Sequence, residues 1–211
     1  MSLDRFQQVI TSVDEITDLI GAPSELVIKK QLAHLDQHMQ SFIGESPFVL
    51  LGTVGADGRC DVSPRGDQAP VAQVLDSKTL VLADRPGNRR ADSLHNILAT
   101  GQVGLLFLVP GMGETLRING RACVMRDEEI LEAMAAGEKK PLLGIGITVE
   151  ESYFQCAKAL IRSKLWARHE RHPQATSRHF AELLIEQTGM QCDSVESLAE
   201  QIEQSYRDRL Y

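Results

Sequence analysis

The stretch SPFVLLGTVGADGRCDVSPRGD (residues 46–67) contains the pattern of a complete β-hairpin. SPFVLLGTV is a short apolar run, and ADGR (56–59) is a turn signal of the kind that joins two antiparallel strands. CDVSPRGD follows as the second strand. We therefore expect two paired strands here, with the polar segment SPRGD (63–67) at the end of the second one.

Further short runs follow the hairpin and extend the same pattern. They are rich in Val, Leu and Ile and are separated by turn residues: VAQVLD, SKTLVLAD, QVGLLFLVP and ETLRINGRACVM. One helix-like stretch (88–99) interrupts the series. About six strands therefore lie within residues 47–126, which is typical of a small antiparallel β-barrel with an inserted helix. A last strand is expected near Gly146–Val149.

Helical patterns flank the strands on both sides. Residues 4–44 are predicted to be helical, with a helix over 24–42 for which Ser24 is a plausible N-cap. After the strands, DEEILEAMAAG predicts a short helix capped by Asp127, and HFAELLIEQTG and SVESLAEQIEQSYRDRLY predict polar C-terminal helices. We interpret the chain as a single domain with three parts: N-terminal helices (1–44), a barrel (45–150) and a C-terminal helical segment (151–211).

The composition limits the class of protein. The 211 residues are 43% hydrophobic, which is enough for a sizeable core, and the formal charge of −7 argues against a general nucleic-acid binder. No apolar run reaches the roughly 20 residues needed to cross a bilayer, and the N-terminal sequence lacks a signal-peptide pattern. The four cysteines form no CxxC pair, so we expect a cytoplasmic protein without zinc or disulfide bonds.

The segment DRPGNRRADS (84–93) lies between a strand pattern and a helix pattern. Its Pro-Gly pair ends the strand and Asn88 is a good N-cap, so Arg89 and Arg90 are predicted in the first turn of a helix. Positive charge there opposes the helix macrodipole, whereas free N–H groups and two guanidinium groups together favour a bound anion, best a phosphate. The alternative is that both arginines point to solvent or pair with a neighbouring carboxylate, Asp84 or Asp92.

Two other polar segments contain candidate binding residues. In SPRGD, Ser63 offers a hydroxyl, Arg65 a third cation and Gly66 a close backbone approach, unless the segment is an ordinary turn capped by Asp67. In GMGETLRINGR (111–121), two polar residues alternate outward if Leu116 and Ile118 face the core. These two are Thr115 and Arg117.

Metal ligands and the common catalytic signatures are not indicated. No GxxxxGK[ST], GxGxxG, GxSxG or HExxH pattern occurs. His34 and His38 are four residues apart but lack a third ligand, and HERHP (169–173) resembles a helix end. A solvated surface is the favoured interpretation of both.

The run SPFVLLGTVGADGRCDVSPRGD…VLDSKTLVLADRPGNRRADSLHNIL…VGLLFLVPGMGETLRINGRA resembles the pyridoxamine 5′-phosphate oxidase-like FMN-binding proteins, in particular a bacterial branch of largely unassigned substrate. The resemblance covers about residues 42–125 and extends weakly through CAKALIRSKLW (156–166). It implies a split β-barrel homodimer that binds FMN at the subunit interface.

The resemblance also implies roles for individual residues. Asn88, Arg89 and Arg90 match the phosphate-binding turn of the family, and Ser63 and Arg65 lie on the strand that contributes to the phosphate and the ribityl chain. Leu82, Ala83 and Asp84 match the strand whose backbone passes the isoalloxazine ring. Thr115 lies where the family often has a Gln that reaches the flavin from the partner subunit. The expected cofactor-binding residues are therefore Ser63, Arg65, Gly66, Leu82, Ala83, Asp84, Asn88, Arg89, Arg90, Thr115 and Arg117.

The C-terminal part departs from the vitamin B6 oxidases. Their Arg-Leu-His-Asp-Arg-like segment, which helps to hold the substrate, has no equivalent here, so we do not expect activity on pyridoxamine phosphate. Lys158 and Arg162 are four residues apart and project in one direction from a helix that Trp166 continues. These three are candidates for closing over the flavin or binding an anionic substrate. The alternatives are an exposed helix with Trp166 in the core, and Cys156 as a small buried residue rather than a reactive one.

Three functions remain open from the sequence. The first is an FMN-dependent oxidoreductase, in which the flavin carries the chemistry and the protein supplies binding and orientation. The second is a flavin-binding carrier or sensor without turnover. The third is haem binding, against which the phosphate-directed arginines argue. The expected partners are a second copy of the chain and a small-molecule substrate, with no nucleic acid and no membrane.

Overall fold

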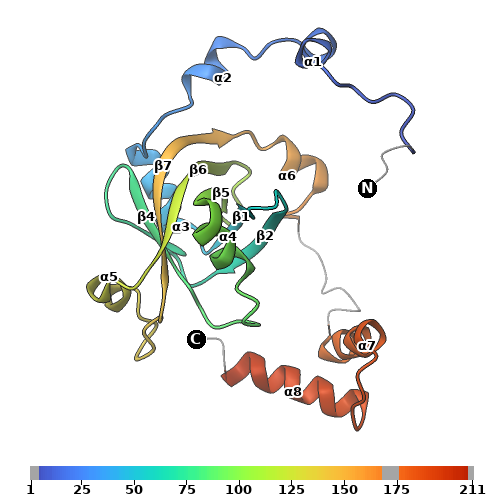
Figure 1. Ribbon diagram of the computed structural model, residues 1–211. Coiled ribbons are helices and arrows are strands. Elements are labelled where there is room, and N and C mark those ends of the chain that lie inside the picture. The colour runs from blue at the N-terminus through green and yellow to red at the C-terminus, as the bar shows by residue number, and fades with distance from the viewer. Residues whose placement is uncertain (1–4, 168–175, 209–211) are drawn as a thin grey trace.

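The computed structural model describes residues 5–167 and 176–208, and Figure 1 shows a curved sheet with helices around it. The protein is mainly β with helical additions, as expected. The strands are β1 (Phe48–Val54), β2 (Cys60–Gly66), β3 (Ala72–Val74), β4 (Thr79–Ala83), β5 (Gln102–Leu108), β6 (Thr115–Met125) and β7 (Gly144–Gln155). The helices are α1 (Val13–Ile20), α2 (Glu25–Lys29), α3 (Gln37–Glu45), α4 (Asp92–Thr100), α5 (Glu128–Ala133), α6 (Lys158–Ser163), α7 (Ser177–Thr188) and α8 (Val195–Asp208).

In the described residues the strands form one seven-stranded sheet with the order β2-β1-β5-β6-β7-β4-β3. Every neighbouring pair is antiparallel, beginning with the β1–β2 hairpin that residues 46–67 predict. The ladder of backbone hydrogen bonds ends at β2 on one side and at β3 on the other. The sheet is therefore curved but not closed by main-chain pairing.

The core lies against one face of this sheet because apolar side chains alternate along the strands. Val49 and Leu51 of β1 are fully buried, as are Phe107 of β5 and Ile118 of β6. Each such side chain stabilises the fold by about 1.5–3 kcal/mol through its removal from water. The inserted helix α4 packs across β1, β2, β5 and β6 and buries Leu94 and Ile97.

The predicted helix over 24–42 is wrong in its middle. The chain forms α2, leaves the helical path at Lys30, and begins α3 only at Gln37. Leu32 pairs with Ser152 of β7 instead, and Asp36 caps α3 by accepting a hydrogen bond from Met39 N at 2.8 Å. The sheet contact and the aspartate cap together break the apolar pattern into two helices.

The last strand exists but is much longer than the Gly146–Val149 expected from the sequence. β7 pairs with β6 along nearly its whole length, across a bulge at Asn119/Gly120. Only glycine fits at this bulge, because a Cβ on Gly120 would overlap the carbonyl oxygen of Thr148. β7 is long because the bulge lets the ladder continue past an irregular point.

The remaining helices agree with the sequence patterns. Asp127 is the N-cap residue of α5, and α7 and α8 fall on the two predicted C-terminal patterns and pack against each other. None of the helices in 5–167 and 176–208 combines the length and the apolar character that a membrane crossing needs. The division into three parts within one domain stays a prediction.

Candidate functional site

The two ends of the open sheet are linked by ion pairs. Arg65, near the end of β2, donates from Nη1 to Asp84 Oδ1 at 2.7 Å, and Arg85 donates from Nε to Asp67 Oδ2 at 2.6 Å. All four side chains are at most 26% exposed. These four residues define what we call the seam, where ion pairs rather than a β-ladder link the end of β2 to the end of β4.

Polar side chains of β2 face the seam from the core side. Ser63 lies opposite the fully buried Leu51 and therefore points to the same face, together with Asp61 and Arg65. Arg65 Nε donates to Ser63 Oγ at 3.2 Å, and the buried Ser93 at the start of α4 donates to Asp61 Oδ2 at 3.0 Å. The two hydroxyls are 3.1 Å apart. Since Ser93 has given its hydrogen to Asp61, Ser63 is the donor between them.

Helix α4 starts later than the sequence predicts, which moves the two arginines. The helix begins at Asp92, not at residue 88, and the residue before it, Ala91, has a φ of 57°. Asn88 does not cap the helix; its Oδ1 accepts a hydrogen bond from Arg90 N at 3.0 Å. Arg89 has a φ of 62°, in the left-handed region that few residues adopt. Arg89 and Arg90 therefore lie in the loop before the helix rather than in its first turn.

The alternative, that Arg89 and Arg90 point to solvent or pair with a neighbouring carboxylate, agrees with the structure in part. Arg90 Nε donates to Asp92 Oδ2 at 2.8 Å on the surface, and this hydrogen bond raises the pKa of the guanidinium. Asp84, the other candidate partner, pairs with Arg65 instead. Arg89 and Arg90 are both exposed, beside the α4 start that contains Ser93.

The residues expected to contact a ligand through their backbone differ in burial and in hydrogen bonding. Leu82 and Ala83 are buried, and β4 has a hydrogen-bonded neighbour on each side at Leu82. The N–H of Asp84 donates to Leu143 O at 2.9 Å, so that group is occupied. Gly66 is exposed, and a Cβ there would meet Phe48 only at an ordinary contact of 3.7 Å. The fold itself does not require glycine at this position.

The remaining candidates form a second group, of which the two on β6 lie on the opposite face of the sheet. Pro64 of β2 lies opposite Leu50, Leu50 opposite Leu106, and Leu106 opposite Arg117, so these four side chains share a face. Ser63 points to the other face. Three strand spacings of about 4.8 Å each also separate β2 from β6. Within one chain, Arg117 is therefore not brought to the seam.

Residues of β6 and of the segment after β7 make up this second group. Arg117 is exposed over the ring of Tyr153, at 5.8 Å from its centroid. Thr115 shares the face of Arg117, but it is buried rather than outward. Trp166 is 38% exposed and donates from Nε1 to Met112 O at 2.5 Å, so it is not a core residue.

Of the alternative for the C-terminal candidates, the structure shows the exposed helix α6 but not Trp166 in the core, and α6 ends at Ser163, before Trp166. Lys158 and Arg162 are exposed, and no residue of α6 is buried. Cys156 is exposed and free, as are the other three cysteines.

A protein-family model matches the part of the chain that contains the sheet and the seam. The model for pyridoxamine 5′-phosphate oxidase matches residues 35–156, more than half of the chain. The chain belongs to the pyridoxamine 5′-phosphate oxidase family. The family match spans the whole sheet and both sides of the seam, and it leaves α1, α2, α6, α7 and α8 outside.

Solved structures similar to this family member have low sequence identity to it. HupZ of Group A Streptococcus is 21% identical over 58% of this chain and 94% of its own, with a TM-score of 0.48. A Clostridium acetobutylicum protein related to general stress protein 26, of the pyridoxinephosphate oxidase family, is 14% identical over 56% and 86% with a TM-score of 0.43. An FMN-binding protein from Syntrophomonas wolfei is 12% identical over 67% and 92%, also with a TM-score of 0.43. No curated protein matches the chain.

Several polar residues in or beside the seam were not identified from the sequence. Asp61, Ser93 and Arg85 sit within or beside the motifs, and only the contacts across the sheet distinguish them from surface residues. Gln73 of β3 is the clearest case. Its Oε1 atom is buried and has no hydrogen-bond partner among the described residues. The sequence signal for Gln73 was its position inside the apolar run VAQV (71–74), where a polar side chain is unexpected.

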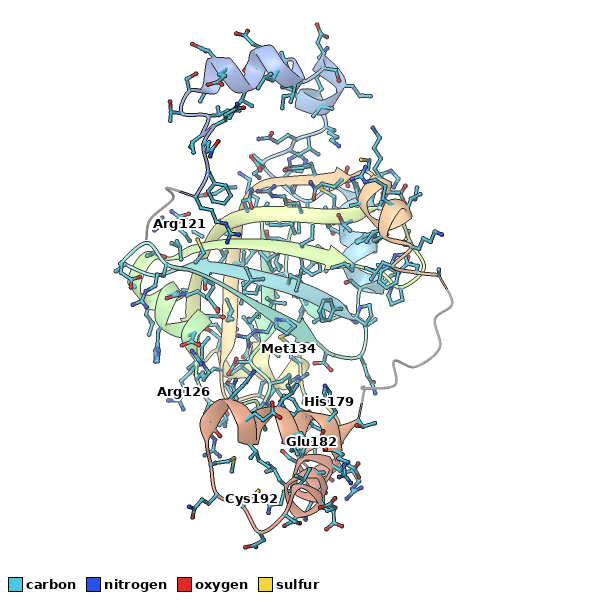
Figure 2. All side chains as sticks on the ribbon, turned by 90° about the vertical axis from the view of Figure 1, so that its right-hand side faces the viewer. Arg121, Arg126, Met134, His179, Glu182 and Cys192 are labelled. Atoms are coloured by element: carbon cyan, nitrogen blue, oxygen red, sulfur yellow. The ribbon has the colours of Figure 1, made fainter. Side chains whose placement is uncertain are left out.

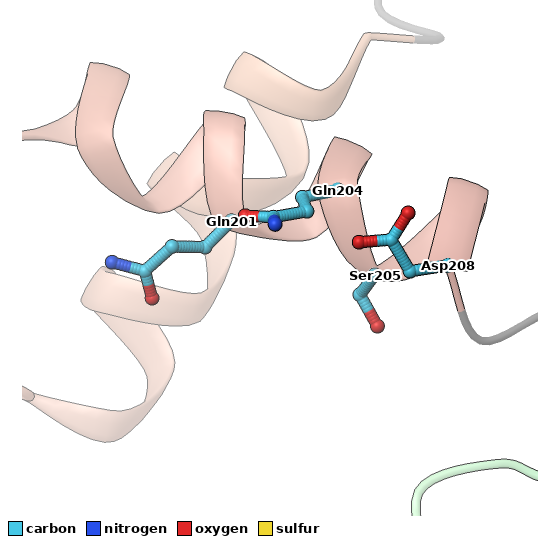
Figure 3. Close-up of a pocket in the computed structure, with 4 residues that line it drawn as sticks. All are labelled: Gln201, Gln204, Ser205 and Asp208. Atoms are coloured by element: carbon cyan, nitrogen blue, oxygen red, sulfur yellow. The ribbon is translucent and has the colours of Figure 1, made fainter.

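Gln73 lines a hollow of about 340 Å³ beside the seam. Asp67 and Arg85 form one side of it, and residues 133–137, from the end of α5 onward, form the other. Figure 3 shows a second hollow on α8, lined only by residues of that helix: Gln201, Gln204, Ser205 and Asp208. None of the candidate residues lines either hollow, but the first hollow adjoins them, because Asp67 and Arg85 follow Gly66 and Asp84 directly in the chain.

Metal ligands are not grouped in the part of the chain that the structure describes. No three His, Cys, Asp or Glu residues there are arranged to hold an ion. His34 and His38 are exposed. The HERHP segment (169–173) lies outside the described residues.

Proposed function

We propose that this family member binds FMN at the seam of a homodimer and is an FMN-dependent oxidoreductase acting on a small molecule. The observation that carries the proposal is the half-buried guanidinium of Arg65 beside the hydroxyls of Ser63 and Ser93. These donors lie next to the loop that carries Arg89 and Arg90. A cluster of hydroxyls and guanidinium groups is the donor set that a phosphate monoester requires.

The donors at the seam fit a phosphate group. A guanidinium has five N–H donors, and the hydrogen bonds of Arg65 to Asp84 and Ser63 use only two N–H groups. The hydroxyls of Ser63 and Ser93 turn by rotation about one bond, so they address a phosphate without a backbone change. Asp61 and Asp84 hold these donors in place, and the phosphate would replace them as the acceptor.

The hollow beside the seam fits the polar edge of a flavin ring. Gln73 Oε1 is an acceptor without a partner among the described residues, and a buried acceptor of this kind costs about 1–3 kcal/mol. The isoalloxazine edge presents an N–H donor together with carbonyl acceptors. Because this oxygen is buried, a ring in the hollow would satisfy it once the Gln73 amide turns toward the hollow.

We propose a dimer because the two groups of candidate residues do not meet within one chain. Thr115 and Arg117 share a face of the sheet that Ser63 and Arg65 do not. That face also carries apolar side chains that no helix of the described chain buries completely, among them Leu50, Leu106 and the 65% exposed Val62. A second copy packed on it would cover this surface and bring the second group to the seam of the first.

In the proposed dimer, the role of the protein side chains is to bind FMN and the substrate and to orient them. FMN, when bound, would supply hydride or electron transfer. Arg65, Ser63, Arg89 and Arg90 would neutralise and hydrogen-bond the phosphate. Lys158, Arg162 and Trp166 of the partner would meet an anionic substrate over the ring. The four free, exposed cysteines suit the reducing cytoplasm that we propose for the protein.

The absorption spectrum of the purified protein tests the proposal directly. We expect the two visible bands of an oxidised flavin, release of FMN on denaturation as identified by mass, and stoichiometric uptake of added FMN. A colourless protein that takes up no FMN would contradict the proposal, and a Soret band would identify haem instead. Flavin that binds but is never reduced by NADH, NADPH or candidate substrates would favour a carrier or sensor.

A further inference from the structure

The N-terminal segment, residues 5–30, carries an apolar surface that its own chain does not cover. We call it the arm. In α1 the side chains Val13, Ile16 and Ile20 share one side of the helix and are 77%, 45% and 80% exposed. Helices of about eight residues are not stable alone in water, so α1 needs a surface to pack on. Because the exposed side of α1 is apolar, the surface that it packs on must also be apolar.

The arm is attached to β7, a few residues before the helix α6. Leu32 and Ser152 exchange two backbone hydrogen bonds of 3.0 and 2.8 Å, and Lys30 Nζ donates to Phe154 O at 2.7 Å. Phe154 lies four residues before Lys158, the first residue of α6. From this attachment the arm rises away from the sheet, as both Figure 1 and Figure 2 show.

A second uncovered apolar surface lies at α6. Ile161 and Leu165 are 69% and 49% exposed, and Trp166 is tied to the exposed Met112 by its indole hydrogen bond. Residues 156–167 contain three cations and no carboxylate. We call this surface the α6 patch; it consists of Met112, Lys158, Ile161, Arg162, Leu165 and Trp166.

The arm and the α6 patch are complementary in charge as well as in apolarity. Residues 5–28 contain four carboxylates against the single cation Arg5, and three of these carboxylates lie on α1. An acidic amphipathic helix and a basic apolar patch attract each other, with the charges at the rim and the apolar side chains between them. Neither surface is covered within the described chain.

We propose that the arm of one copy packs on the α6 patch of a second copy. The proposal rests on the homodimer of the proposed function. A two-fold dimer contains every contact twice, so one exchange of arms covers both arms and both patches. The arm leaves the sheet at Ser152 of β7, next to Tyr153 on the face proposed as the interface. The arm would then lie over Lys158, Arg162 and Trp166, on the side from which a substrate reaches the flavin.

Photo-crosslinking of the full-length protein tests the exchange. The photoreactive residue p-benzoylphenylalanine replaces Ile16, and in a matched control it replaces Leu142, which is 83% exposed on a loop. We expect irradiation of the Ile16 variant to give a product of two-chain mass on a denaturing gel, with the crosslink mapped to residues 112 or 157–167. The Leu142 control should give no such product. Crosslinks within one chain, to another segment, or none at all would overturn the proposal.

A substitution separates this proposal from the proposed function. Ile16→Asp should weaken dimerisation by about tenfold or more in sedimentation experiments, because it removes a buried apolar contact, whereas Leu142→Asp should not. FMN uptake is measured on the unsubstituted protein in parallel. An Ile16→Asp dimer as tight as that of the original protein overturns the arm exchange alone. A protein that binds no FMN overturns the proposed function, whatever the crosslinks show.

Discussion

Arg65 is the residue whose removal should most affect FMN binding. Its guanidinium is 19% exposed and already oriented by Ser63 and Asp84. We expect Arg65→Ala to weaken FMN binding by about 1.5–3 kcal/mol, or about 10- to 150-fold in Kd, because a charge-assisted hydrogen bond to the phosphate is lost. Fluorescence quenching of FMN during titration measures the change.

Two variants control for side effects of that substitution. Arg59→Ala removes an arginine from the β1–β2 hairpin turn, where it pairs with Asp57 on the surface, and it should leave the Kd unchanged. Asp84→Asn breaks the Arg65 pair but keeps Arg65, so it should preserve or tighten binding. Equal losses in Arg65→Ala and Asp84→Asn would show that the seam is only structural.

Arg90 tests whether the loop before α4 belongs to the site. In this structure its side chain is held at the surface by Asp92. We expect Arg90→Ala to weaken FMN binding by about tenfold while thermal stability stays unchanged, because the exposed pair contributes little to folding. An unchanged FMN affinity would limit the phosphate site to β2 and the start of α4.

At the scale of the element, capping is testable on two adjacent helices. Asp36 accepts a hydrogen bond from Met39 N at the start of α3, whereas Ser24 makes no side-chain bond at the start of α2. Asp36→Ala should lower the free energy of unfolding by about 1 kcal/mol, and Ser24→Ala should change it little. Urea denaturation of both variants gives the comparison, and equal effects would contradict the assignment of the caps.

The elements that the sequence predicts well are those with a local pattern. The β1–β2 hairpin follows from a turn between two apolar runs, and α7 and α8 follow from helical periodicity. The break at Lys30 and the late start of α4 could not be predicted, because both depend on distant contacts. Leu32 leaves the helix to pair with Ser152, which is 120 residues away. Asp61 and Ser93 could not be recognised as candidate site residues from the sequence, because the hydrogen bond between them joins positions 32 residues apart.

At the scale of the whole molecule, the proposed interface makes binding and assembly inseparable. Leu106→Asp places a charge at the centre of the shared face, in the row that ends at Arg117. We expect this variant to sediment as a monomer and to lose FMN, since in the proposed dimer the partner supplies part of each site. Leu98→Asp, at a 73% exposed position on α4, is the matched control. A Leu106→Asp monomer with full FMN occupancy would contradict the interface.

The seam also determines how a cofactor can enter. The outer edge of β2 has no main-chain partner in the described sheet, and ion pairs link it to the segment after β4. An edge strand of this kind opens locally more often than central strands, so amide hydrogens near residues 60–67 should exchange sooner than those of β5 or β6. Loading of the cofactor would then be a local breathing event rather than partial unfolding, and bound FMN would slow that exchange.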